Sequence, residues 1–254
     1  MNTIFYMERR SYEKDGFVYL LDDNQTAWIR EGSTDGQRSY RLPESIDVAG
    51  KSYVITDTDI GAFCDEPNLE ELIVPDCYKY IDEDSFRGCA KLSRVHLGRG
   101  IKWFHQWTFA ESQNVKILLD PNNPYLKTSD DGTMIVSPDG KTLIAVIDRN
   151  VRVLDVPEGI ETIAPIAISC LTELEELTLP LSLKEIDGNG IMDCHKLKEL
   201  VIPENVTETG FQCVEWCEKL ETITIPSHLQ SISDALKEDN PSLKYVILSD
   251  SKSR

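Results

Sequence analysis

Apolar residues return along most of the chain with a period of about 23 residues. Counted from Ile163, the positions 5, 8, 11, 14, 16, 20 and 23 residues later are all apolar, and the same offsets from Ile81 fall on apolar residues or cysteine. A fixed period of this length indicates a solenoid, in which each unit buries its apolar side only against its neighbours. Starting points that follow the pattern, some more loosely than others, are Thr58, Ile81, Ile163, Ile186, Thr209 and Ile232.

Each repeat contains a Leu-x-x-Leu-x-Leu segment whose alternation predicts a short strand. A proline directly after the segment lacks an N–H for a sheet and therefore ends the strand; these prolines are Pro75, Pro157, Pro180, Pro203 and Pro226. Stacked units predict one parallel strand each. The other half of each unit is expected to return as a short helix or an irregular arch, with core positions at Phe63, Phe86, Phe109 and Ile168. The predicted fold is a mainly β repeat solenoid.

Two segments depart from the repeat and predict β-hairpins. Two β-prone runs, 17–21 and 26–30, flank Asp22-Asp-Asn24, and two more within 132–147 flank Pro138-Asp-Gly140, which is turn chemistry. The first hairpin is expected to cap the N-terminal end of the core, and the second to be inserted in the solenoid. The predicted organisation is one continuous solenoid domain with a hairpin cap and first irregular strands (1–57), repeats (58–119), the inserted hairpin (120–150), repeats (151–248) and a tail (249–254).

The charge of the chain narrows its possible partners. Of 254 residues, 44 are acidic and 26 are basic, which gives a net charge of −18. Such a field repels nucleic acid and anionic lipid, so we expect neither direct nucleic-acid binding nor membrane insertion. No run approaches the roughly 18 apolar residues of a membrane span. The sequence as given predicts a soluble, cytoplasmic monomer, or a surface or secreted protein if an export signal preceded it.

Three of the seven cysteines share one repeat position. Cys89, Cys194 and Cys217 stand where Leu171 stands in another unit, and interchange with leucine predicts small, buried core side chains. An odd number of cysteines also fits a closed disulfide framework poorly. The weaker alternative is a zinc site built from Cys213, Cys217 and the Cys194-His195 pair, which would need four converging ligands.

Residues on either side of the inward strand positions are expected to line the concave face of the solenoid. Curved repeat arrays commonly bind partners there, although a merely solvated sheet surface is an equal alternative. The candidates form a mixed ladder of Glu71, Arg94, His96, Lys116, Asp155, Glu176, Thr178, Glu199, Thr222 and Tyr245, beside Ile73, Leu118, Val153, Val201, Thr224 and Ile247. Trp103 and Trp107 are further candidates, because aromatic residues are enriched at binding hot spots. The favoured interpretation, however, packs both indoles between units or against the inserted hairpin.

Catalytic signatures do not appear in the sequence. The four histidines lack metal-ligand spacing, and no phosphate-binding glycine loop or nucleophile elbow occurs. The carboxylates scatter through turns. We therefore expect no enzyme activity, no cofactor and no metal.

The repeat resembles a known family, the BspA-like leucine-rich repeat proteins of bacteria. The resemblance extends from about Leu42 to Leu248 and rests on the pattern Ile-x4-Phe-x2-Cys-x2-Leu-x2-Val-x-Leu from Ile81 to Leu97. It rests also on the Ile-Pro and Leu-Pro strand ends and on Asp120-Pro-Asn-Asn-Pro-Tyr125 with the following Asp-Gly turns. The resemblance implies a right-handed leucine-rich solenoid without catalytic residues. Many such proteins are surface proteins proposed to bind host or matrix proteins.

Three functions follow as hypotheses. The first is a non-catalytic scaffold that binds a protein or peptide on the concave face or the inserted hairpin. The second is an acidic inhibitor or immunity-type protein that blocks a basic site on a target. The third is a cell-surface adhesin, which requires export.

Overall fold

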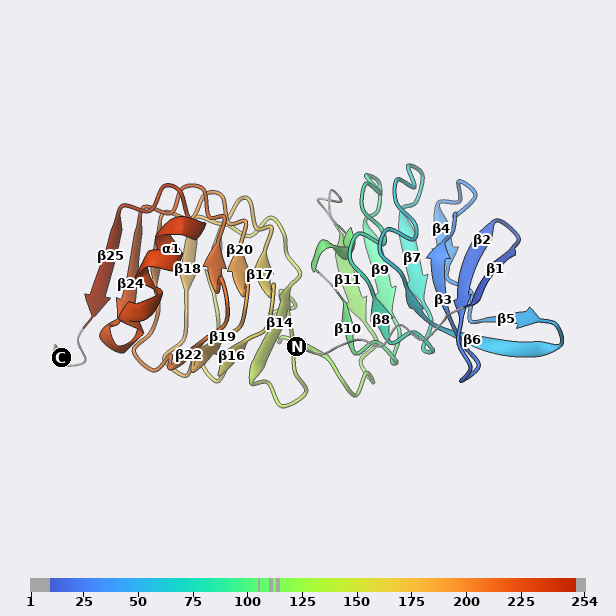
Figure 1. Cartoon of the computed structure of the whole chain (residues 1–254), viewed down its shortest axis with the longest axis horizontal. Helices are drawn as coiled ribbons and strands as arrows, with labels where there is room; N and C mark the ends of the chain where they lie inside the picture. Colours follow the sequence, from blue (N-terminus) through green and yellow to red (C-terminus); the bar gives the residue numbers. More distant parts are fainter. Residues whose placement is uncertain (1–9, 105, 110–111, 113–114, 250–254) are drawn as a thin grey trace. The chain divides into compact units, whose positions relative to one another are not determined.

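The structure is a computed structural model that describes residues 10–104, 106–109, 112 and 115–249. The chain divides into two compact units, Met1–Leu126 and Lys127–Arg254, both built mainly of short strands (Figure 1). Each unit is described by itself below. That the two units form one continuous solenoid stays a prediction.

Two parallel arrays of strands run along the first unit. In the first array Glu71 aligns with Arg94 and Arg94 with Lys116, so equivalent residues of successive coils lie beside one another. This is the parallel stacking that the 23-residue period predicted. The strands of the first array are β4 (Ser39–Arg41), β7 (Glu71–Val74), β9 (Arg94–Leu97) and β11 (Lys116–Leu119), and those of the second are β3 (Thr26–Glu31), β6 (Lys51–Thr58), β8 (Tyr80–Ile81) and β10 (Trp103–Phe104).

Antiparallel strands open the first unit. The predicted hairpin is present as β2 (Phe17–Leu21) and β3, joined through Asp22, whose carboxylate accepts hydrogen bonds from the backbone and hydroxyl of Thr26 at 2.8 and 2.7 Å. Two further strands, β1 (Arg10–Lys14) beside β2 and β5 (Ser45–Val48) beside β6, lie in the segment that the sequence left irregular. Strand β3 then pairs in parallel with β6 and so begins the second array.

The second unit opens in the same way. Strands β12 (Lys127–Thr128), β13 (Met134–Val136) and β14 (Thr142–Val146) are antiparallel, which confirms the hairpin. Strand β14 also pairs in parallel with β16 (Thr162–Ile163). The second strand of the hairpin, β14, is therefore also the first strand of a parallel array, so the hairpin is part of the solenoid. Strand β3 has the same place in the first unit.

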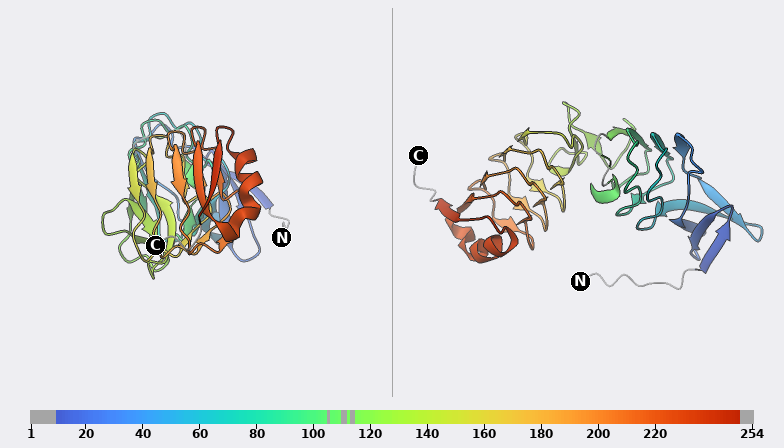
Figure 2. Two further views of the ribbon diagram at one scale, coloured as in Figure 1. Left: turned by 90° about the vertical axis from the view of Figure 1, so that its left-hand side faces the viewer. Right: turned by 90° about the horizontal axis from the view of Figure 1, so that it is seen from above.

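Three arrays of parallel strands follow the coils of the second unit, which Figure 2 shows from two further directions. The half-repeat that was expected to form a short helix or arch contains short strands here, whereas in the first unit it consists of turns and the 3-10 helix Gln106–Phe109. The strands are β15 (Val153–Asp155), β18 (Glu176–Thr178), β21 (Glu199–Val201), β24 (Thr222–Pro226) and β25 (Tyr245–Ser249) in one array; β16, β19 (Glu185–Ile186) and β22 (Glu208–Thr209) after β14; and β17 (Ile168–Ser169), β20 (Ile191–Met192) and β23 (Val214–Glu215).

Helices replace the third array in the last coil. The 3-10 helix Ser227–Ile232 and helix α1 (Ser233–Asp239) lie between β24 and β25. Asn240 directly follows α1 in the sequence and occupies the same repeat position as Cys194 and Cys217. It is fully buried. Its side chain donates to the carbonyl oxygens of Val214 and Leu236, both at 2.9 Å, and accepts from the N–H of Cys217 at 3.1 Å. This amide thereby joins α1 to the preceding coil.

Aromatic rings form a continuous stack in the core of the first unit. The ring centroids of Phe63 and Phe86 lie 5.1 Å apart in stacked geometry, and those of Phe86 and Phe109 lie 6.0 Å apart. Phe17 of the hairpin closes the stack edge-on against Phe63 at 5.9 Å. All four rings are buried, as is Ile168 in the second unit, which confirms the predicted inward positions.

Two predicted core leucines are less buried than expected. Leu177 on β18 is half-buried, whereas its equivalents Leu154, Leu200 and Ile223 are buried, although it still packs against the core. Leu248 on β25 is 39 % exposed. Leu248 lies on the edge strand β25, which within the described residues pairs only with β24.

The cysteines at the shared repeat position are core side chains, as predicted. Cys89, Cys194 and Cys217 are fully buried, and their thiols donate to backbone carbonyls, for example Cys89 Sγ to the Phe63 oxygen at 3.5 Å. Burial raises the pKa of Cys89 to about 11, so the thiol stays protonated and unreactive at neutral pH. Among the described residues no group of three or more His, Cys, Asp or Glu side chains is placed to hold a metal ion.

Left-handed backbone conformations recur at two positions of each coil in the second unit, and one of these two positions includes Ile166. Ile166, Asn189 and Gln212 have φ of 61°, 56° and 52° at equivalent positions. Asparagine tolerates this region, whereas a β-branched side chain is strained in it. Ile166 therefore holds a conformation that the neighbouring coils impose.

Replacing Ile166 with asparagine is expected to raise the free energy of unfolding by about 1 kcal/mol, because it removes the left-handed strain of the β-branched residue. Urea denaturation followed by circular dichroism measures the difference. The control is Ile60→Asn, since Ile60 is 61 % exposed and has no positive φ; it should change stability by less than about 0.5 kcal/mol. A loss of stability in Ile166→Asn would contradict the strain argument.

Candidate functional site

The predicted binding residues lie on the outward side of one array in each unit, which we call the ladder face. It belongs to strands β7, β9 and β11 in the first unit and β15, β18, β21, β24 and β25 in the second. The strand registers bring equivalent candidates side by side. The aligned sets are Glu71, Arg94 and Lys116; Ile73, His96 and Leu118; Val153 and Glu176; Asp155 and Thr178; Glu199, Thr222 and Tyr245; and Val201, Thr224 and Ile247.

Glu71, Arg94 and His96 on the ladder face of the first unit bind one another. Glu71 Oε1 accepts hydrogen bonds from Arg94 Nε at 3.0 Å and from His96 Nε2 at 3.1 Å, and Ser39 Oγ donates to the other carboxylate oxygen at 3.0 Å. The bonds from Arg94, His96 and Ser39, in that order, lower the pKa of Glu71 to about 2. The carboxylate is ionised and held in place, so this part of the ladder face carries matched charges.

Apolar side chains are exposed on the ladder face of the second unit. Val153 is 52 % exposed, Val201 59 %, Tyr245 62 % and Ile247 48 %. The last three lie on β21 and β25, on either side of the threonines of β24. The alternation of inward and outward residues along each strand predicted that these side chains point outward. It did not predict that several of them would be exposed to solvent on the same face. A cluster of this kind is what a partner surface can bury.

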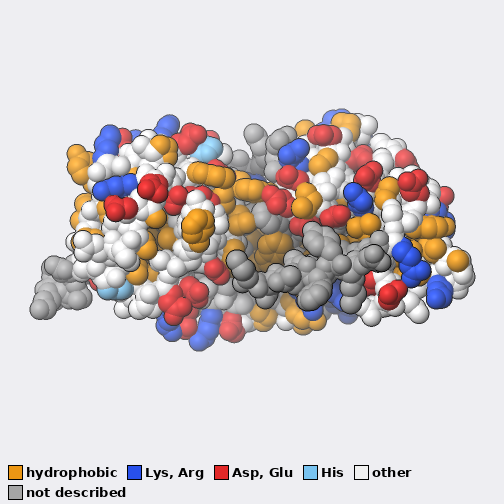
Figure 3. All heavy atoms as spheres, viewed as in Figure 1, with side chains coloured by type: hydrophobic (Ala, Val, Ile, Leu, Met, Phe, Trp, Pro, Cys, Tyr) orange, Lys and Arg blue, Asp and Glu red, His pale blue; other side chains and the backbone are white. Residues whose placement is uncertain are grey.

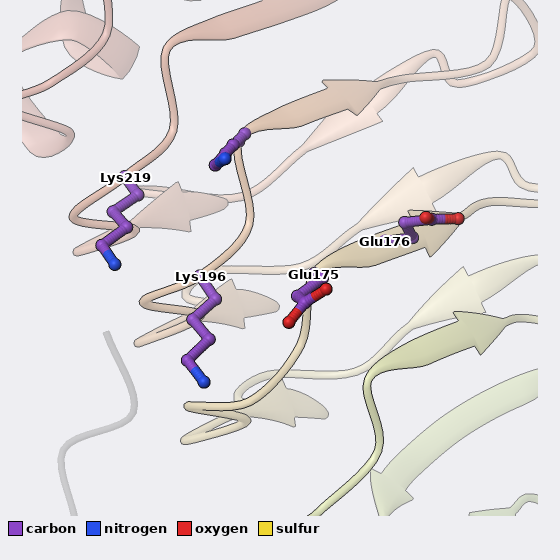
Figure 4. A pocket seen from close by; sticks show the side chains of 5 residues that line it. Glu175, Glu176, Lys196 and Lys219 are labelled. Carbon is purple, nitrogen blue, oxygen red and sulfur yellow. The ribbon is translucent and has the colours of Figure 1, made fainter.

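The ladder face of the second unit is interrupted between β18 and β21. No strand pairing joins these two strands, although the described coils continue to pair in the other arrays. A cavity of about 410 Å³ lies at the interruption and is lined by Glu175, Glu176, Lys196, Lys198 and Lys219. Figure 4 shows Lys196 and Lys219 extending in the same direction, with Glu175 close to Lys196. Sequence analysis identified Glu176 but not the lysines.

Opposite charges of neighbouring coils form ladders that the sequence analysis also missed. Arg152 binds Glu175 at 2.7 Å and Lys196 binds Glu173 at 2.6 Å, each across 23 residues. Glu161 is bound by both Lys141 and Lys184, at 3.0 and 2.8 Å. Opposite charges 23 residues apart are the sequence signal that could have revealed the pairs of Arg152 with Glu175, Glu161 with Lys184 and Glu173 with Lys196.

The two candidate tryptophans lie elsewhere. Trp103 is on β10 in the second array, and Trp107 is in the 3-10 helix that follows; both are half-buried. Neither belongs to a strand of the ladder face. His105 between them lies outside the described residues.

A small polar cluster occurs beside the third array of the second unit. Asp193 lies 3.6 Å from His195 Nε2, and the Cys170 thiol donates to Asp193 at 3.9 Å. Burial is the largest effect on Asp193 and raises the pKa of this carboxyl group. At these long distances the three groups do not form the short nucleophile–base hydrogen bond that nucleophilic catalysis needs.

This arrangement of one short parallel strand per 23-residue coil, around a leucine-rich interior, defines a leucine-rich repeat solenoid. The family model described as BspA type leucine rich repeat region matches residues 56–129 and 148–254 with six copies. The chain therefore belongs to the BspA type leucine-rich repeat family. Proteins with such arrays are a general class of interaction scaffold.

Solved structures of bacterial leucine-rich repeat proteins resemble the chain. One from Eubacterium ventriosum is 14 % identical with a TM-score of 0.51, and the match covers 96 % of this chain and 80 % of that one. A leucine-rich cell surface protein from Faecalibacterium prausnitzii is 16 % identical with a TM-score of 0.36, over 97 % and 96 % of the two chains. One from Bacteroides ovatus is 18 % identical with a TM-score of 0.45, over 92 % and 67 %. The first likeness supports the fold.

None of the curated proteins matches the chain significantly. Within the part of the chain that the structure describes, no helix has the length and apolar character needed to cross a bilayer.

Proposed function

We propose that the protein is a non-catalytic scaffold that binds a protein or peptide on the ladder face of its second unit. The observation that carries the proposal is the exposure of Val201 on β21 and of Tyr245 and Ile247 on β25, the two strands that flank β24. Rigid strands present these side chains at fixed spacing, so a partner can bury them without the entropy cost of ordering a loop. Glu71, Arg94 and His96 of the first unit already bind one another, which makes that part the weaker binding surface.

Affinity capture tests the proposal. The full chain is immobilised and exposed to an extract of its native cell, and the variant Val201→Ser/Tyr245→Ser/Ile247→Ser is compared with the wild type. We expect the variant to bind the partner at least about tenfold more weakly than the wild type. This corresponds to a loss of roughly 1.4 kcal/mol of binding free energy. The matched control Leu181→Ser/Phe211→Ser/Trp216→Ser removes three apolar side chains that are exposed outside the ladder strands.

The outcomes of this capture separate the possibilities. Equal loss in the variant and the control would contradict a site on the ladder face, because it would indicate nonspecific adhesion. A variant that captures as much partner as the wild type would also contradict it. Thermal unfolding of all three proteins confirms that the substitutions leave the fold intact.

The acidic-inhibitor hypothesis stays a prediction that the charge arrangement does not favour. Acidic and basic side chains are interspersed on the face in Figure 3, and carboxylates such as Glu71, Glu161 and Glu175 are bound by cations of neighbouring coils. Binding through a net charge of −18 would weaken steeply with added salt. Cytoplasmic and cell-surface locations both stay predictions, which fractionation of the native cell distinguishes.

A further inference from the structure

Hydrogen bonding between coils follows one rule at the start of the ladder strands. The N–H groups of two successive residues bind the carbonyl oxygen one repeat earlier, as Glu175 and Glu176 bind Arg152 at 2.8 and 3.1 Å. Glu221 and Thr222 bind Lys198 in the same way, at 2.9 and 3.2 Å. The same double bond occurs again at the start of β7, β9 and β25.

Two strands depart from this rule: β11 makes only one of the two bonds, from the Lys116 N–H to the Ser93 carbonyl oxygen at 2.9 Å, and β21 makes neither. The rule places the N–H groups of Lys198 and Glu199 on the carbonyl of Glu175, but no such bond forms. Within the described residues these two N–H groups have no hydrogen-bond partner. Leu177, on the adjacent strand β18, is only half-buried beside this missing strand pairing. Free backbone donors at the edge of a cavity can bind an anion.

Lysines surround this opening. Lys198 continues an alternation of charge at one repeat position, which runs Arg152, Glu175, Lys198, Glu221 and Lys244. Its neighbours are already paired, Glu175 with Arg152 and Glu221 with Lys244 at 3.2 Å. Neither Lys198 nor Lys219 makes an ion pair among the described residues. The cavity lining therefore includes the ammonium groups of Lys198 and Lys219 beside the carboxylate of Glu176, none of which makes an ion pair among the described residues. The two unpaired backbone N–H groups belong to the lining residue Lys198 and to its chain neighbour Glu199.

We infer that this cavity binds carboxylate side chains of an acidic peptide segment, and so supplies the polar part of the proposed partner site. The inference rests on the proposed function, because the adjacent apolar residue Val201 lies on the same strand, β21, as Glu199. A segment that places a carboxylate against Lys198 and Lys219 can place an aliphatic side chain on Val201. A polyanion such as nucleic acid is the weaker candidate, since it would leave the exposed apolar side chain of Val201 without a partner.

The probe is a synthetic peptide with alternating glutamate and leucine, titrated into the ¹⁵N-labelled full chain. We expect amide shifts to concentrate at Lys198, Glu199 and Val201. The variant Lys198→Gln/Lys219→Gln should weaken binding at least fivefold, as expected for the loss of two exposed charge contacts of about 0.5 kcal/mol each. The control Lys79→Gln/Lys237→Gln removes two other exposed lysines that form no ion pair among the described residues and should change nothing.

A charge exchange makes the test specific. A lysine-leucine peptide should cause no concentrated amide shifts at residues 198–201 of the wild type but should cause them in Lys198→Glu/Lys219→Glu. Inorganic phosphate is titrated separately. Shifts with phosphate but none with the peptide would overturn the inference in favour of a small-anion site, and equal weakening in the control would overturn it in favour of diffuse charge attraction.

The two proposals fail in different experiments. If the Val201, Tyr245 and Ile247 variant loses its captured partner while the acidic peptide causes no shifts, the carboxylate site is wrong and the scaffold proposal stands. If capture does not depend on those apolar residues, the scaffold proposal fails whatever the peptide does.

Discussion

Replacing Phe86 with alanine is expected to lower the free energy of unfolding by about 3–5 kcal/mol. Phe86 is fully buried, and its ring stacks on Phe63 on one side and on Phe109 on the other. Truncation removes the apolar area of one ring and the stacking of two pairs, and the neighbouring coils cannot collapse into the gap without losing their strand pairing. Urea denaturation followed by circular dichroism measures the change.

Two control variants, Phe86→Leu and Phe211→Ala, are measured beside Phe86→Ala. Phe86→Leu keeps most of the buried volume and should cost less than Phe86→Ala. Phe211→Ala removes the same ring from a position that is 80 % exposed and should change stability by less than about 0.5 kcal/mol. Equal effects at positions 86 and 211 would show that the stack does not stabilise the first unit.

Replacing Asn240 with alanine is expected to cost about 3 kcal/mol, because it leaves buried backbone groups without partners. The Asn240 amide binds the carbonyl oxygens of Val214 and Leu236 and the N–H of Cys217. No water reaches a fully buried site to replace these bonds. The measurement is again urea denaturation, combined with hydrogen exchange of the Cys217 amide, which should lose its protection.

An exposed asparagine provides the matched control. Asn205 donates to the carbonyl oxygen of Leu181 at 2.7 Å, but water can replace that bond, so Asn205→Ala should cost less than about 1 kcal/mol. Cys217 exchange that stays slow in Asn240→Ala would contradict the role of this amide in holding α1 on the preceding coil.

Residue spacing by itself determined the repeat, the parallel stacking and most of the core. Each inward residue occupies the same place in every coil, so a position such as Phe86 or Cys194 is specified by its distance from its neighbours in sequence. The outward ladder positions followed from alternation along each strand. The hairpins followed from their turn residues.

Tertiary structure decided how the coils meet. Whether β18 pairs with β21 depends on differences in strand separation that no repeat template contains, so the opening beside Lys198 could not be read from the sequence. The hydrogen bonds of Glu71 with Arg94 and His96 depend on side chains of separate coils. The joint exposure of Val201, Tyr245 and Ile247 depends on separate coils in the same way. The role of Asn240 could not be predicted from the repeat either. Its polar amide occupies a core position because it binds a backbone carbonyl oxygen of helix α1, and this helix is present only after the last coil has folded.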